Sequence, residues 1–218
     1  MKDRIIFVFL TALMLGAGTG QAQNRYFQDG EHGISLQGGG LWSDGASGLA
    51  GVATLTIMGR FDLGVGYTSP QSTSGVGYTY HWNEFTPFLG VSLLRPQVDR
   101  PLGVDFTASY TTVKFSGVQA SRLGGDSKSA GVDLYFALRE SNSVTILPRV
   151  GAAYVSANAW YKPEVDLPET SETVESIMFG LELAFLIKNK FIIAPSVTSF
   201  DGIRTLSFMV GLALPQEW

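Results

Sequence analysis

The last third of the chain alternates between large apolar residues and small or polar residues with a period of two. In the segment from Ser176 to Ile187, one parity carries Ile177, Phe179, Leu181, Leu183 and Phe185. A second segment repeats the pattern with Leu206, Phe208, Val210, Leu212 and Leu214. Successive side chains leave a strand on opposite faces, so this pattern predicts strands with one large apolar face and one small or polar face. The wall of a membrane-spanning β-barrel needs these two faces.

The N-terminus has the three regions of a secretory signal peptide. Lys2 and Arg4 form a basic region, and a short apolar run follows from Ile5 to Ala17. Small residues at Gly20 and Ala22 then fit a cleavage site. We therefore expect residues 1–22 to be removed. The alternative, an N-terminal membrane anchor, is weaker because the apolar run is shorter than the ~20 residues a spanning helix needs.

The composition excludes several classes of protein. The chain has no cysteine, so lipid attachment at cysteine, disulfides, thiolate metal sites and cysteine nucleophiles are ruled out. Its formal net charge is −4, and no basic patch favours binding to nucleic acid. The 26 glycines and the 12% of aromatic residues fit a crowded barrel interior and two aromatic girdles. No cofactor is predicted.

The alternation predicts an all-β fold, a closed antiparallel transmembrane β-barrel of about ten strands, with eight or twelve as the alternatives. The expected strands are 34–42, 51–58, 61–68, 78–94, 104–115, 131–138, 144–160, 174–187, 191–200 and 204–214. Residues 23–33 have no period and are expected to be a periplasmic lead-in to a barrel over 34–218. Long polar loops are expected at 69–75, 116–129 and 161–172.

The fourth strand contains a change of phase. Its aromatic residues before position 83 lie on even positions, whereas its apolar residues after position 86 lie on odd positions. Either a turn at Asn83–Glu84 separates two strands, or a β-bulge joins two parts of one strand. We favour the bulge, because two strands would make eleven and single-chain bacterial barrels normally have an even number.

Two stretches carry a resemblance to a known family. RFDLGVGYTS at Arg60 to Ser69 and FTPFLGVSLL at Phe85 to Leu94 look like strand pairs of the porin-like outer-membrane β-barrel domain family. The terminal Trp218 resembles the aromatic end that barrel-assembly machinery recognises, although Pro215 is expected to break the last ladder. The resemblance implies a small Gram-negative barrel in the cell outer membrane, in contact with outer-membrane lipid and monomeric. These families share architecture and not activity.

Five charged residues fall on the small-residue parity of their strands and are expected to face the lumen. They are Asp62, Asp105, Asp133, Arg149 and Glu182. One interpretation is an ion-selective path. The other, which we favour, is a buried network in which Arg149 bridges several carboxylates, because buried charges normally occur in pairs. Four acids against one base leave an excess of negative charge.

Few residues offer catalytic chemistry. The histidines are His32 and His81, and His81 with Glu84 and a serine between Ser69 and Ser74 would be one route to an enzyme. We favour an interfacial role for His81 among Tyr78, Tyr80 and Trp82, since a catalytic triad is recognised by geometry. No catalytic residue and no metal site is therefore predicted.

The predicted function is non-enzymatic, with a structural, surface-interaction or narrow-pore role. One rival is an outer-membrane enzyme acting on lipid. The other is a soluble secreted β-barrel that binds an apolar ligand, because alternation alone also describes soluble β-proteins. The face that carries the large apolar side chains distinguishes a soluble barrel from a membrane barrel. These side chains lie on the inside of a soluble barrel and on the outside of a membrane barrel.

Overall fold

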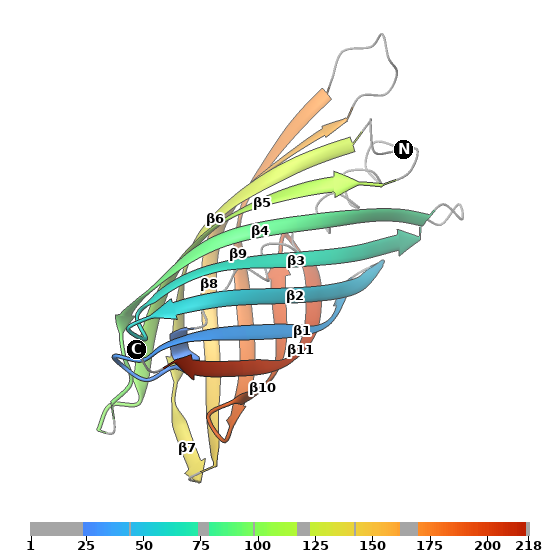
Figure 1. The fold of residues 1–218 in the computed structure, drawn as a ribbon. Helices are drawn as coiled ribbons and strands as arrows, with labels where there is room; N and C mark the ends of the chain where they lie inside the picture. The colour runs from blue at the N-terminus through green and yellow to red at the C-terminus, as the bar shows by residue number, and fades with distance from the viewer. Residues whose placement is uncertain are drawn as a thin grey trace.

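The chain folds into a closed antiparallel β-barrel (Figure 1). The computed structural model describes residues 24–43, 45–73, 79–97, 99–116, 123–141, 143–161 and 170–216. The expected signal peptide at 1–22 and Trp218 lie outside this part of the chain. Within it, no helix is both long and apolar enough to cross a membrane.

The described residues form one short helix and eleven strands. They are η1 Asn24–Tyr26, β1 His32–Ser43, β2 Ala46–Ile57, β3 Phe61–Thr73, β4 Thr79–Leu94, β5 Leu102–Phe115, β6 Leu123–Phe136, β7 Leu138–Ser141, β8 Val144–Tyr161, β9 Thr170–Ile187, β10 Phe191–Phe200 and β11 Ile203–Gln216. β6 and β7 both pair with β8 and are separated only at Ala137, so together they form one wall strand. The barrel therefore has ten strands, as predicted.

Pairing between the first and last strands closes the wall. β1 and β11 are in register from His32 opposite Gln216 to Ser43 opposite Thr205. The expected interruption at Pro215 is wrong, because the pairing continues through Gly33 opposite Pro215. We call the end where β1 starts and β11 finishes the terminal end, and the opposite end the loop end.

Three hairpins turn through two residues in the left-handed region of φ, which suits the right-handed twist of paired strands. The residues are Met58 and Gly59 (φ 55° and 62°), Lys188 and Asn189 (52° and 53°), and Asp201 and Gly202 (46° and 82°). The first two hairpins lie at the terminal end and the third at the loop end. These tight turns fix the register of the strands that they join.

Several strands are longer than the alternation predicted. β3 continues to Thr73, β6 begins at Leu123, and β9 begins at Thr170, so residues 69–73, 123–129 and 170–172 of the long loops expected at 69–75, 116–129 and 161–172 are strand, while 74–75, 117–122 and 162–169 lie outside the described residues. The backbone ladder continues here although the side chains on both faces become polar or small. Large apolar and small or polar residues alternate only where a strand separates an apolar from a polar environment. The strands predicted from this alternation are therefore shorter than the strands in the structure.

β4 is one strand, but the bulge expected at Asn83–Glu84 is wrong. Thr68 pairs with Glu84 and Gln71 pairs with His81 in one unbroken register. The register shift lies at the other end of the strand, between Ser92 and Leu94. The change of phase has another cause: the even positions face the lumen throughout β4, and near the loop end they carry aromatic residues, including the buried Trp82.

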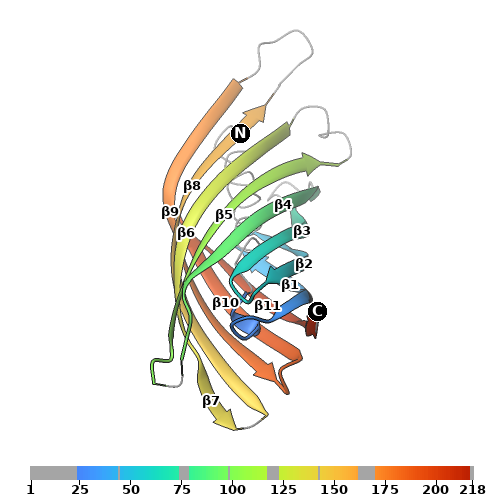
Figure 2. The same cartoon turned by 60° about the vertical axis from the view of Figure 1, so that its left-hand side comes forward.

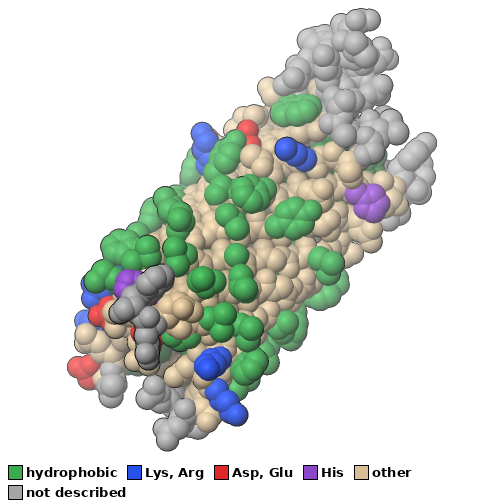
Figure 3. Space-filling view, viewed as in Figure 1, with side chains coloured by type: hydrophobic (Ala, Val, Ile, Leu, Met, Phe, Trp, Pro, Cys, Tyr) green, Lys and Arg blue, Asp and Glu red, His purple; other side chains and the backbone are tan. Residues whose placement is uncertain are grey.

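The outside of the wall is apolar. Leu181, Leu183 and Phe208 are 57%, 41% and 46% exposed, which confirms the predicted assignment of faces. Exposed aromatic residues recur on six strands toward the loop end of this band: Trp42, Tyr67, Phe85, Tyr110, Tyr154 and Phe179. Phenylalanines lie where strands begin or finish at the terminal end: Phe61, Phe136 and Phe191. Figure 3 shows hydrophobic side chains spread over this wall, with charged side chains nearer its two ends.

Candidate functional site

A chain of buried ion pairs links three adjacent strands on the inside of the wall. Arg149 on β8 lies 3.1 Å from the Asp133 carboxylate on β6 and 3.5 Å from the Glu182 carboxylate on β9. The registers bring these groups together, because Arg149 is directly opposite Tyr135 on one neighbour and Glu182 on the other. The predicted bridging role of Arg149 thus matches the geometry for two of the four acids.

A second arginine, from outside the strands, completes this chain. Arg25 in η1 donates a hydrogen bond to Glu182, and its guanidinium lies 5.0 Å from the centre of the Tyr26 ring. The side chains of Arg25 and Glu182 are only 2% and 8% exposed. The resulting order is Arg25–Glu182–Arg149–Asp133, with two charges of each sign. The negative excess expected from the strands alone is therefore reduced by a cation that the alternation did not reveal.

Residues 24–31 form a plug in the terminal end of the barrel. Tyr26 and Phe27 are buried in the same apolar cluster as lumen residues such as Leu147. We expected this segment to be a lead-in ahead of the barrel, whereas in the structure Arg25, Tyr26 and Phe27 are buried in the interior. The segment has no hydrophobic period because it is not a strand, so the alternation of side chains could not predict this packing.

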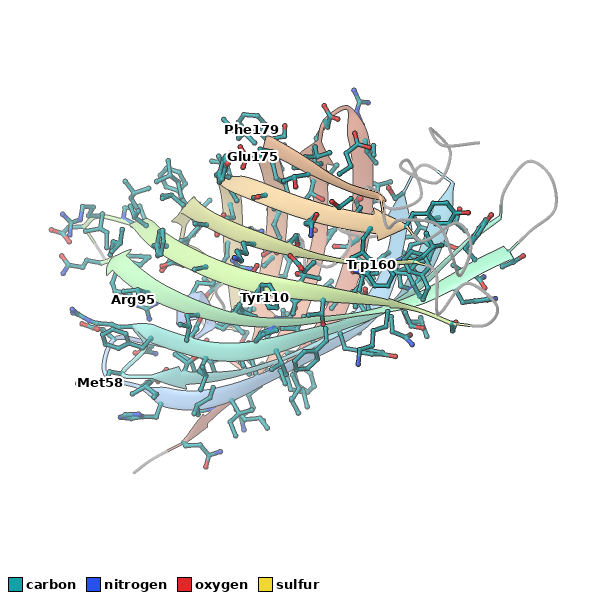
Figure 4. All side chains as sticks on the ribbon, turned by 90° about the horizontal axis from the view of Figure 1, so that it is seen from above. Met58, Arg95, Tyr110, Trp160, Glu175 and Phe179 are labelled. Carbon is teal, nitrogen blue, oxygen red and sulfur yellow. The ribbon has the colours of Figure 1, made fainter. Side chains whose placement is uncertain are left out.

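Three contacts hold the plug to the wall. Asp29 accepts two hydrogen bonds from Arg60, at 2.8 and 3.0 Å, and these hold the pKa of Asp29 below its usual value. The Gly30 amide donates to the Met58 carbonyl at 3.0 Å. Arg95, in the connection after β4, donates to the backbone carbonyl of Phe27. Figure 4 shows Met58 and Arg95 at the same end of the barrel, opposite Trp160.

The other two predicted lumen acids lie apart from this chain. Asp62 is buried on β3 and accepts a hydrogen bond of 2.7 Å from Thr56 on β2. Asp105 on β5 is directly opposite Asp133 and is 1% exposed. It forms no ion pair with any described residue. Two carboxylates side by side in the lumen repel each other, and only Asp133 has Arg149 to compensate.

A second buried layer fills the lumen toward the loop end. Glu84 is 1% exposed and accepts hydrogen bonds from the Trp82 indole at 2.8 Å and the Thr68 hydroxyl at 2.6 Å. The Trp82 ring packs against Phe115 with centroids 5.8 Å apart. We expected Trp82 at the lipid interface, and that expectation is wrong. A lumen-facing aromatic and a lipid-facing aromatic look alike in sequence, so only the register distinguishes them.

Among the described residues, the catalytic grouping considered around His81 does not form, and Ser74 lies outside them. His81 is exposed on the outside of β4, whereas Glu84 and Trp82 face the lumen. Ser69 is also on the outside, and Ser72 faces inward with its hydroxyl bonded to the Gly45 carbonyl at 2.6 Å. In the described part of the chain no group of three or more His, Cys, Asp or Glu side chains is arranged to hold a metal ion.

Two cavities border the charged chain. One of ≈ 580 Å³ opens at the terminal end between the plug, Arg95 and the walls around Leu147 and Leu186. The other, of only ≈ 30 Å³, is lined by Asp133, Arg149 and small residues of β6, β8 and β9. The second is large enough for about one or two water molecules. Of the charged chain, Arg25 lines the first cavity, and Asp133 and Arg149 line the second.

Comparisons with known proteins agree with the fold. No protein-family model matches this chain, and no curated protein matches it in sequence. The translocator domain of autotransporter NalP from Neisseria meningitidis superposes with a TM-score of 0.54 over 98% of both chains, at 12% identity.

Two further solved structures are similar at lower scores. The β domain of the Bordetella autotransporter Brka gives a TM-score of 0.48 at 10% identity, covering 85% of this chain and 99% of that one. Ail of Yersinia pestis gives 0.40 at 16% identity, covering 87% and 100%. The chain has the fold of an outer-membrane β-barrel, and at these identities the likeness extends to the fold alone.

Proposed function

We propose that the chain is an integral protein of the bacterial outer membrane that acts without catalysis, as a closed barrel presenting its loop end at the cell surface. The observation that carries this proposal is the direction of the side chains in the wall, which is the reverse of that in a soluble barrel. Large apolar side chains such as Leu181 and Phe208 face outward, and the charged side chains face the lumen. Lipid is the environment in which an outward apolar band is stable. The proposed partners are outer-membrane lipid and, during insertion, barrel-assembly machinery.

A closed lumen favours a structural or surface role over transport. At the terminal end, the plug places Arg25, Tyr26 and Phe27 inside the barrel. Toward the loop end, Trp82 and Glu84 are bonded to each other and buried. A solute would have to displace both layers, including paired buried charges, to pass through the barrel. Breaking such pairs is costly.

The two rival functions fit the geometry less well. An enzyme using His81 would need a carboxylate and a nucleophile on the same side of the wall, whereas Glu84 lies on the opposite side. A soluble barrel would expose its outer apolar band to water. Exposed apolar areas of this extent are unusual for soluble monomers.

Fractionation and conductance test the proposal. The protein should band with outer membranes in a density gradient and need detergent for extraction. Reconstituted into a planar bilayer, it should give no sustained conductance steps, while an open porin measured in the same bilayers gives them. Recovery in the soluble periplasm would overturn the location, and sustained steps from the wild-type protein would overturn the closed lumen.

A further inference from the structure

The wall of the barrel has a step at its loop end. β9 pairs with β8 over its whole length, from Tyr161 opposite Thr170 to Val144 opposite Ile187. Its pairing with β10 ends at Phe200 opposite Met178, because the chain turns back there at Asp201–Gly202. Figures 1 and 2 show β8 and β9 reaching well beyond β10 and β11. Within the part of the chain that the structure describes, residues 170–177 of β9 therefore have a neighbouring strand on one side only.

This free edge lacks several of the features that normally protect an edge strand, and its only charged residues are Glu172 and Glu175. Lysine, proline, glycine bulges or shortening usually prevent an edge from pairing with another chain. The segment reads TSETVESI, with no lysine, proline or glycine and with four β-branched residues. An unprotected row of amides and carbonyls is a template on which an extended peptide can add a strand.

The position of the edge places it in water. Phe179 and Ile177 are the last large apolar residues on the outside of β9, and the outward positions beyond them are Glu175, Thr173 and Ser171, all exposed. Figure 4 shows Glu175 and Phe179 on the outside of β9. On the inside, Val174 packs against a small apolar cluster of Val155, Met178, Phe200 and Ile203. The edge thus rises from the apolar band into the aqueous layer.

The charges on this edge define its partner. Glu172 and Glu175 are both exposed, and Glu175 accepts a hydrogen bond from Tyr154. Asp201 is exposed at the turn of the neighbouring hairpin, where Arg204 is the basic side chain. Two copies of the chain joined through this edge would bring their carboxylates together, which is unfavourable. A strand that carries basic side chains would instead be attracted.

We propose that residues 170–177 of β9 bind an extended, basic polypeptide segment by adding it as a further antiparallel strand beside β9. This inference deepens the proposed function, since it names the class of partner that the loop end takes. Backbone hydrogen bonds to the free edge supply the binding, an apolar side chain of the partner covers Val174 on the inside, and basic side chains on the outside select for Glu175.

A designed peptide tests this proposal on the whole protein in zwitterionic detergent micelles. The probe is a labelled peptide of about eight residues that alternates lysine and valine, matched to the length of the edge. Binding is measured by fluorescence anisotropy, and amide hydrogen exchange reports where the peptide lies. We expect saturable binding and slower exchange confined to residues 170–177.

Matched controls distinguish binding by strand addition from purely electrostatic binding. The same peptide N-methylated at alternate residues keeps its charges but lacks the amides for a ladder, and a glutamate–valine peptide reverses the charge; both should fail to bind. The variant Glu175→Lys should weaken binding of the lysine peptide about fivefold, while Glu31→Lys, at the terminal end, should leave the binding unchanged.

Four results would overturn the proposal. They are unchanged exchange of residues 170–177 at saturating peptide, equal binding of the N-methylated peptide, full protection of this segment in the free protein, and concentration-dependent dimerisation that protects it. The third result would assign the edge to another part of this chain, and the fourth would assign it to a second copy. None of them bears on membrane location or conductance, so the two proposals fail separately.

Discussion

Arg25 donates a hydrogen bond to Glu182 across 157 positions of sequence, and this contact joins the plug to the wall of the barrel. Glu182 also lies 3.5 Å from Arg149, so a single carboxylate is shared by two buried guanidinium groups. The contact explains how a segment without regular strand structure remains inside the lumen. It also makes Glu182 the residue on which the interior charge balance depends.

Glu182→Gln should therefore destabilise the barrel. The substitution keeps the shape of the side chain but leaves the buried charges of Arg25 and Arg149 without their shared partner, at a cost of about 3 kcal/mol in the free energy of unfolding. Urea titration of the protein in lipid vesicles, followed by the heat-dependent shift in gel mobility, measures the change. Asp29→Asn removes an exposed pair with Arg60 and should have a much smaller effect. Equal losses for both variants would contradict the buried network.

Asp105→Asn should leave stability unchanged or increase it. Asp105 is buried directly opposite Asp133 and forms no ion pair with a described residue, so neutralising it removes repulsion. The matched variant Asp133→Asn breaks the 3.1 Å pair with Arg149 and should be destabilising. The same unfolding titration compares the two. If Asp105→Asn lowered the free energy of unfolding as much as Asp133→Asn, Asp105 would also be paired.

Two wall glycines should differ sharply in their tolerance of alanine. A Cβ added at Gly211 would lie 2.1 Å from the backbone oxygen of Leu36, at the seam between β1 and β11. A Cβ at Gly180 would meet its nearest neighbour, the Thr198 methyl group, at 3.4 Å. Gly211→Ala should lower the free energy of unfolding by roughly 1–3 kcal/mol through overpacking, and Gly180→Ala should leave it unchanged. The reverse order would show that the seam is not closed as the register indicates.

The period of two was enough to predict the class of fold, the number of strands and the outward face. It succeeded where a strand separates lipid from lumen, as in β9 around Leu181 and Leu183. It did not reveal the strand extensions into water, as at Thr170, where neither face is apolar. The alternation of side chains reports only whether the two faces of a strand lie in different environments. Backbone pairing between strands continues beyond the region where they do.

The candidate site was only partly predictable for a similar reason. Parity placed Asp133, Arg149 and Glu182 in the lumen, and their register then brought them together. Arg25 lies in a segment without a period, and its partner is distant in sequence, so nothing local indicated that it was buried. Trp82 was assigned to the wrong environment because aromatic residues occur both in girdles and in filled lumens.

The assignment of faces is the central claim, and cysteine labelling tests it most directly because the chain has no cysteine of its own. Leu183→Cys and Thr173→Cys place single thiols on the outside of the same strand, one within the apolar band and one beyond it. In outer membranes, a water-soluble maleimide should label Thr173→Cys rapidly and leave Leu183→Cys unreacted, while a lipid-borne quencher should reach only a probe at position 183. Equal labelling of the two by the water-soluble reagent would contradict a barrel whose apolar wall lies in lipid.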